Sequence, residues 1–195
     1  MNIEPVTLEG RTIALVPLLR EHVDGGWKAG SDPEIWKLTT AKVHSREDMV
    51  AYIETALGEQ ARGVSLPFTT ILRATGEVVG MTRFGSIARE HKRVEIGWTF
   101  VTPLHQRTAV NTEAKYLMLR HAFEVWGCNR VELKTGSLNS KSRNAMLRIG
   151  AKEEGILRQH IINADGFVRD TVYFSVIAGE WPEVKAGLEE KLSRS

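Results

Sequence analysis

The chain has 195 residues, 42% of them hydrophobic and 26% charged, a composition typical of a globular domain with a sizeable apolar core. Its formal net charge is only +2, so the charge balance gives no indication of a nucleic-acid partner. A single cysteine, Cys128, excludes an intramolecular disulfide, and no stretch approaches the roughly 18 apolar residues of a membrane span.

The first part of the chain predicts a strand followed by helical segments. Residues 6–18 alternate between apolar and polar side chains, with an interruption at residues 9–11, as a strand does. Residues 20–60 have a helical pattern in pieces, and Pro33 after Asp32 is typical of a first helical turn. We expect a longer helix from Ser45, its cap, to about residue 60.

The middle of the chain predicts a hairpin and a third strand. Residues 67–73 and 77–86 are apolar, β-rich runs joined by a turn that contains Gly76. Residues 93–102 continue as a strand until Pro103, which cannot donate a hydrogen bond to a sheet. We therefore expect three consecutive strands here.

The last part of the chain predicts a helix capped by Gly127, a strand, a short helix and a hairpin that turns at Asp165-Gly166. These elements are expected at residues 112–126, 130–135, 140–149, 154–163 and 167–178. The strand–helix–strand unit at 93–135 should form a right-handed parallel crossover, and the other neighbours should pair antiparallel. The prediction is a mixed α/β fold, a twisted sheet with helices on both faces.

The segment 98–115 has the strongest indication of chemistry. A strand ends, a polar loop follows and a helix begins, and the exposed N–H groups of a helix start suit a phosphate. The alternative is a plain strand–helix connection, which every such unit contains. No glycine-rich nucleotide motif occurs, and the six histidines with one cysteine show no metal-ligand spacing, so we expect no metal.

Short motifs in a fixed order indicate a family. They are Leu8-Glu9-Gly10-Arg11, Ser31-Asp32-Pro33-Glu34, Val94-Glu95-Ile96-Gly97-Trp98, Asn111-Thr112-Glu113-Ala114, Asn139-Ser140-Lys141-Ser142-Arg143, Ile149-Gly150-Ala151 and Glu154-Gly155-Ile156-Leu157-Arg158. With these motifs the chain resembles the GNAT acetyltransferase superfamily, and within it ribosomal-protein N-terminal acetyltransferases of the RimJ/RimL type. The resemblance spans residues 8–181 and implies one acyltransferase domain, residues 1–195, with a sheet of about seven strands. It implies transfer of an acetyl group from acetyl-CoA to a primary amine, for which a protein N-terminal amine is one candidate.

The resemblance also implies how the donor binds. In that family a Q/R-x-x-G-x-G/A loop holds the CoA pyrophosphate on its backbone N–H groups, and the corresponding residues here are 106–111. Ala109 and Asn111 depart from that pattern; we expect Asn111 to cap the following helix and Arg107 to add charge. The cofactor-binding residues implied are Phe100, Val101, Thr102, Arg107, Thr108, Ala109, Val110, Asn111, Thr112, Asn139 and Arg143.

Two catalytic residues follow from the resemblance. Ser142, in an N-x-x-S pattern with Asn139, would donate a proton to the departing thiolate, and a backbone N–H near residues 100–101 would stabilise the oxyanion. Glu95 is the first candidate to take the proton of the amine, ahead of His105 and Glu113. The structural alternatives are that Asn139 only caps a helix and that Glu95 faces solvent.

Other interpretations stay open at this point. The departures at Ala109 and Asn111 would also fit a non-catalytic acyl-CoA-binding sensor, or a relative of the fold that binds no CoA. The aromatic residues Trp27, Trp36, Tyr52 and Trp98 are candidates for the wall of an acceptor pocket or for the core. We expect a cytoplasmic protein whose partners are acetyl-CoA and an amine, with no membrane or nucleic-acid partner. A homodimer is left open, as is the identity of the acceptor.

Overall fold

Eight strands form one mixed sheet in the computed structural model, which describes residues 1–194. Their order across the sheet is β1-β2-β3-β4-β5-β6-β8-β7. The strands are β1 (Leu8–Glu9), β2 (Ile13–Pro17), β3 (Leu66–Leu72), β4 (Val78–Ala88), β5 (Arg93–Val101), β6 (Arg130–Gly136), β7 (Lys152–Ile162) and β8 (Val168–Ile177). Neighbours pair antiparallel except β5 and β6, which are parallel, as the sequence predicted.

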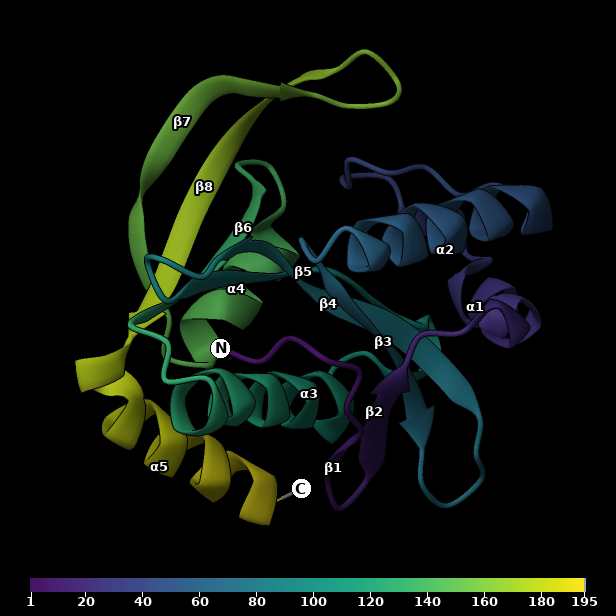
Figure 1. The fold of residues 1–195 in the computed structure, drawn as a ribbon. Helices are drawn as coiled ribbons and strands as arrows, with labels where there is room; N and C mark the ends of the chain where they lie inside the picture. Colours follow the sequence, from purple (N-terminus) through teal and green to yellow (C-terminus); the bar gives the residue numbers. More distant parts are fainter. Residues whose placement is uncertain (195) are drawn as a thin grey trace.

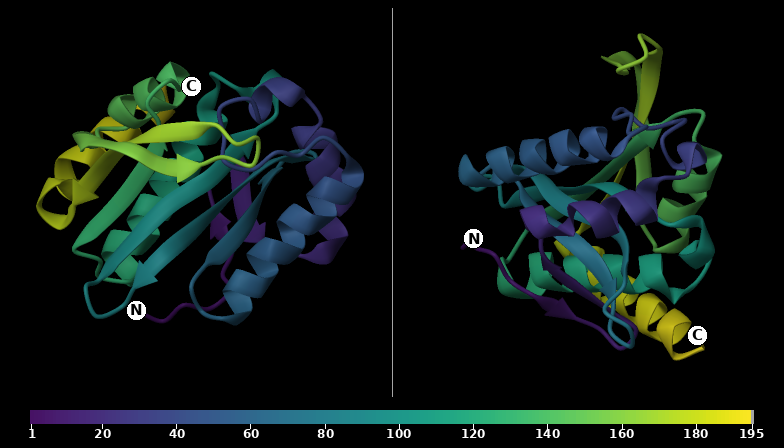
Figure 2. Two further views of the ribbon diagram at one scale, coloured as in Figure 1. Left: turned by 90° about the horizontal axis from the view of Figure 1, so that it is seen from above. Right: turned by 90° about the vertical axis from the view of Figure 1, so that its right-hand side faces the viewer.

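Helices cover both faces of the sheet (Figures 1 and 2). On one face lie α1 (Val23–Gly30) and α2 (Arg46–Ala61), and on the other lie α3 (Ala109–Arg120), α4 (Ser140–Arg148) and α5 (Trp181–Ser193). Each face has its own buried apolar cluster, so the sheet separates two cores. No helix within residues 1–194 has the length and apolar character that crossing a bilayer requires.

Local sequence signals explain most of these elements. The Ser45 side chain accepts a hydrogen bond from the Asp48 N–H at 3.0 Å and caps α2, as predicted. Gly76 has a φ of +73° in the β3–β4 turn, where glycine is the residue with least strain. The Pro33 signal, by contrast, starts only the short 3-10 turn Pro33–Ile35.

Two elements differ from the sequence prediction. The first predicted strand is two strands, β1 and β2, because the chain turns back at Gly10, whose N–H donates to the Ile13 carbonyl at 2.9 Å. Helix α5 was not predicted at all. Its buried residues Trp181, Val184 and Leu188 follow the spacing i, i+3, i+7, so the signal was present in the sequence.

Candidate active site at the separation of β5 and β6

Strands β5 and β6 pair over only three residues and then separate. Their register runs from Arg93 opposite Arg130 to Glu95 opposite Glu132. Beyond Glu95, β5 remains paired with β4, and β6 remains paired with β8. Beyond this point, the edges of β5 and β6 that face each other therefore carry backbone N–H and C=O groups that make no hydrogen bonds between the two strands.

A bulge in β5 lies where the strands separate. Between the pairs Arg83–Gly97 and Met81–Phe100, β5 contains one residue more than β4. Trp98, within this bulge, has a φ of +49°, which is strained for an aromatic residue. Because a bulge bends and twists its strand, this insertion accounts for the departure of β5 from β6.

Backbone directions near the end of β5 show which groups face the gap. The Thr102 N–H donates to the Val79 carbonyl at 2.8 Å, and a Cβ placed on Gly80 would lie 2.1 Å from the Phe100 oxygen. Both observations show that the backbone polar groups of Phe100 and Thr102 point toward β4. Since successive residues of a strand point their backbone groups to opposite sides, the Val101 N–H faces the separated edge.

The start of α3 differs in detail from the sequence prediction. Thr108 is the cap, because its hydroxyl oxygen accepts the Val110 N–H at 3.3 Å while its O–H donates to the His105 carbonyl at 2.7 Å. The expectation that Asn111 caps the helix is wrong, since Asn111 lies inside the first turn. Ala109 is the first helical residue and has no positive φ, so glycine is not needed there. The left-handed residue of the loop is Arg107, with a φ of +62°.

A cavity of about 730 Å³ opens at this helix start. Its walls include Thr108, Ala109, Val110 and Thr112, and its cationic side chains are Arg107, Arg148, Lys191 and Arg194. The Arg148 guanidinium donates to the Thr112 hydroxyl at 3.0 Å and so joins α4 to α3. Two of the cations, Lys191 and Arg194, come from α5 and its end, an element that the sequence did not predict. Positive charge and free helix N–H groups together suit an anion such as a diphosphate.

The N-x-x-S pattern lies at the start of α4. The Asn139 side chain accepts the Ser142 N–H at 3.1 Å, so Asn139 caps the helix through its side-chain oxygen. The Ser142 hydroxyl is half-buried and makes no hydrogen bond within residues 1–194. Arg143 pairs with Glu153 at 3.1 Å and donates to the Ser137 carbonyl at 3.4 Å.

Glu95 is buried where pairing between β5 and β6 ends. Its side chain accepts hydrogen bonds from the Ser86 hydroxyl at 2.9 Å and from the Lys134 ammonium at 2.8 Å. With 3% of its surface exposed, Glu95 does not face solvent, so that structural alternative is wrong. Lys134 follows the last paired residue of β6 by two positions, so this ion pair spans the start of the separation.

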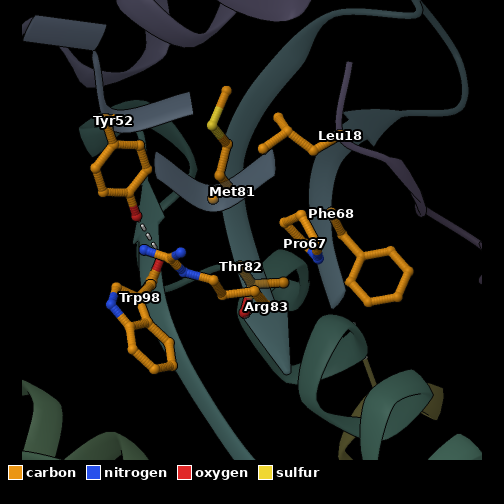
Figure 3. A pocket seen from close by; sticks show the side chains of 9 residues that line it. Leu18, Tyr52, Pro67, Phe68, Met81, Thr82, Arg83 and Trp98 are labelled. Atoms are coloured by element: carbon orange, nitrogen blue, oxygen red, sulfur yellow. Dashed lines mark hydrogen bonds between the residues drawn. The ribbon is translucent and has the colours of Figure 1, made fainter. Parts of the chain in front are cut away.

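Aromatic side chains surround Arg83 on the α2 side of the bulge (Figure 3). The guanidinium carbon lies 4.4 Å from the Trp98 ring centroid and 5.6 Å from that of Tyr52, and one nitrogen is 2.7 Å from Glu59. Tyr52 donates to the Trp98 carbonyl at 3.0 Å, and burial raises the pKa of its hydroxyl. The cavity among these residues holds only about 10 Å³, which is about one water. Tyr52 and Trp98 thus pack around Arg83 with almost no free space between them.

Glu113, a lesser candidate for the proton acceptor, and the single cysteine, Cys128, both lie in structural positions. The Glu113 carboxylate accepts three backbone N–H groups, from Arg11 at 2.6 Å and from Thr12 and Ile13 at 2.9 Å each. It therefore fixes the β1–β2 turn against α3. Cys128 is buried, and burial raises the pKa of its thiol to about 11. A thiol with that pKa is a poor nucleophile at neutral pH.

Comparisons with known proteins show the family and the fold of this chain. The family model of the acetyltransferase (GNAT) domain matches residues 12–152. The uncharacterized N-acetyltransferase YoaA of Bacillus subtilis (strain 168) is 28% identical over 137 residues, which are 69% of this chain and 75% of that protein. A GCN5-related N-acetyltransferase structure from Brucella melitensis is 30% identical, with a TM-score of 0.89 over 96% of this chain and 85% of that one. The fold also matches Mycobacterium smegmatis RimJ in complex with CoA-disulfide, with a TM-score of 0.81 and 22% identity over 96% of this chain and 95% of that one.

Proposed function

The chain belongs to the GNAT acetyltransferase family and is an acetyl-CoA-dependent N-acetyltransferase, and on that premise we propose how its residues bind the donor and transfer the acetyl group. The proposal is direct attack of a primary amine on the donor while both are bound. The observation that supports it most is that β5, the strand with the unpaired edge, is followed in the chain by α3, and the cationic cavity opens at the start of that helix.

The diphosphate of the donor would lie at the start of α3. The N–H groups of the first helical turn have no partner within the helix, and Arg107 and Arg148 lie beside them in the cavity wall. Ala109 fits such a site because it is helical and its φ is not positive, so its methyl group causes no backbone strain. The departures from the family loop therefore do not require loss of donor binding.

The pantetheine arm would lie against the unpaired edge of β5. Val101 presents its N–H to that edge, while Phe100 and Thr102 direct their backbone groups to β4. We therefore assign the oxyanion contact to Val101 rather than to Phe100. The Phe100 ring packs 5.0 Å from Trp36 and supports the strand from the other side.

The reaction needs a proton acceptor and a proton donor. Acetyl-CoA supplies an activated acyl thioester. The amine nitrogen bonds to the thioester carbonyl carbon, the carbon–sulfur bond breaks, and an amide and a free thiol result. Glu95 would take the proton that the amine loses, directly or through water, because it is the buried carboxylate at the separation. Ser142, whose hydroxyl makes no hydrogen bond within residues 1–194, would donate to the leaving sulfur.

Two measurements test this function in sequence. Calorimetry with acetyl-CoA should show binding, and thiol release should then be stimulated by at least one amine from a panel of peptide N-termini, amino acids, polyamines and aminoglycosides. Binding without stimulation by any amine would favour the sensor interpretation. No binding would contradict the donor site at α3.

A further inference from the structure

One arginine on the Glu95 face of the sheet has no carboxylate partner. Strands β5 to β8 carry three glutamates there, and each is already engaged by a cation. Glu95 pairs with Lys134 at 2.8 Å. Glu132 pairs with Arg93 at 2.7 Å and Arg130 at 2.9 Å, and Glu154 with Arg130 at 2.7 Å. Arg169 of β8 makes no ion pair within residues 1–194.

Arg169 is buried despite this lack of a partner. Only 7% of its surface is exposed, and its Nε finds no hydrogen-bond acceptor. Within residues 1–194 the guanidinium makes one hydrogen bond, to the Thr171 hydroxyl, and it is long at 3.4 Å. Burial lowers the pKa of Arg169, and the charge of Glu95 opposes that shift. A buried guanidinium with an unused N–H is costly unless an anion or a carbonyl joins it.

The surrounding structure holds Arg169 close to the reaction centre. Gly136, at the end of β6, leaves room for it, because a Cβ there would lie 2.8 Å from the Arg169 Cδ. Arg169 shares a face with Tyr173, which pairs in register with Lys134, the partner of Glu95. The unpaired guanidinium therefore lies on the same face as the proposed base, two strands away from it across the sheet, with β6 between them.

The tip of the β7–β8 hairpin shelters this region. Asp165 pairs with Lys42 at 3.0 Å, and the Ala164 N–H donates to the Thr40 carbonyl at 3.3 Å. The hairpin projects from the sheet and its tip meets the segment between α1 and α2 (Figures 1 and 2). Arg169, which lies opposite Ile161 in the hairpin, is on the part of the hairpin that leads to this contact.

We infer that Arg169 binds a carboxylate of the acceptor, so that the acceptor is an amine that also carries an acidic group. The inference rests on the proposed function, and it narrows the acceptor to amino acids or to peptides with a carboxylate near the reacting amine. A planar guanidinium matches a carboxylate in geometry as well as in charge. Polyamines and aminoglycosides, which carry only positive groups, would be disfavoured beside Arg169.

Matched acceptor pairs test this inference. The pairs are glycine and glycinamide, β-alanine and its amide, 4-aminobutanoate and its amide, and Ala-Asp-Ala-amide with Ala-Asn-Ala-amide. For at least one pair, kcat/KM should favour the carboxylate by about tenfold, which corresponds to about 1.4 kcal/mol. In Arg169→Gln that ratio should fall to about one while the rate with the amide member stays within about twofold of wild type. Arg169→Lys should keep part of the preference.

A control and a second readout complete the test. Arg158, exposed on the same hairpin, serves as the matched control, and Arg158→Gln should keep the wild-type ratio. Calorimetric titration of the same pairs into CoA-loaded protein measures the preference without turnover. Ratios near one for every pair in wild type, or a preference that survives in a folded Arg169→Gln variant, would overturn the inference. If the wild-type protein did not bind CoA, that would instead count against the proposed function. Titration of the acceptor pairs into the free protein would still measure the preference for the carboxylate.

Discussion

Lys115 of α3 donates a 2.7 Å hydrogen bond to the hydroxyl of Thr99, inside the bulge of β5. The Thr99 hydroxyl is in turn 2.7 Å from that of Thr82 and 3.3 Å from the Gly97 carbonyl. Lys115 is 6% exposed and has no carboxylate partner within residues 1–194, and burial lowers its pKa to about 7. Helix α3, which begins at the cationic cavity, is thus tied to the bulge through a lysine that is largely neutral above that pH.

Replacement of Lys115 by methionine should therefore stabilise the fold, most of all below pH 7. The folded protein binds the Lys115 proton with a pKa of about 7 and the unfolded chain with an ordinary lysine pKa, so the burial cost is complete below pH 7. It declines as the pH rises toward about 10.4, the ordinary value for lysine. We expect a gain on the order of 2–4 kcal/mol at pH 6.5 that shrinks by pH 9.5. Urea unfolding at both pH values measures it, and an equal gain at both would contradict the titration.

Glu95→Gln should lower kcat by about 100-fold while the Kd for acetyl-CoA stays unchanged, because only the proton acceptor is lost. Steady-state kinetics and calorimetry give the two quantities. Glu132→Gln is the matched control, since Glu132 is also buried and ion-paired and lies opposite Glu95 in the register, but its carboxylate is held by two arginines, Arg93 and Arg130. Similar kcat values for Glu95→Gln and Glu132→Gln would show that Glu95 acts only in folding.

Ser142→Ala should lower kcat by about 10- to 100-fold, the effect of one hydrogen bond to a developing charge. Its melting temperature should stay near that of wild type, because the hydroxyl has no partner to lose and the cap from Asn139 uses the Ser142 backbone N–H. Asn139→Ala, by contrast, should lose about 1 kcal/mol of stability through the cap. Wild-type kcat in Ser142→Ala would remove the hydroxyl from the mechanism.

Glycine substitutions at Arg107 and Ala109, at the start of α3, separate the effect of backbone strain on stability from the effect of charge on CoA binding. Arg107→Gly should gain about 0.5–1 kcal/mol of stability, since glycine adopts a φ of +62° without strain, and should bind CoA several-fold more weakly through loss of the cation. Ala109→Gly should lose about 0.5–1 kcal/mol, because the position is helical, with no gain in affinity. Thermal melts and calorimetry check both variants; tighter CoA binding in Ala109→Gly would show that the methyl group hinders the donor.

The sequence determined the elements whose signals are local. The cap Ser45, the turn at Gly76 and the Asp165-Gly166 turn placed helices and strands near their observed bounds. The start of α3 was predicted three residues late, because Thr108 and Asn111 are both acceptable caps and only the loop conformation selects between them. Helix α5 was indicated by the helical spacing of three apolar residues, and all three are buried in the structure. It also supplies cations to the cavity at the start of α3.

The tertiary structure alone decided what surrounds the candidate site residues. The sequence indicated Glu95 and Ser142 through resemblance, yet it gave no sign that Glu95 is engaged by Lys134, or that Lys115 and Arg169 are buried without a carboxylate. Spacing along a chain specifies which residues share a strand or a helix face, whereas partners come from strands that meet only after folding. The separation of β5 from β6 depends on a one-residue bulge, a property of register between strands, and registers are set by packing across the whole sheet.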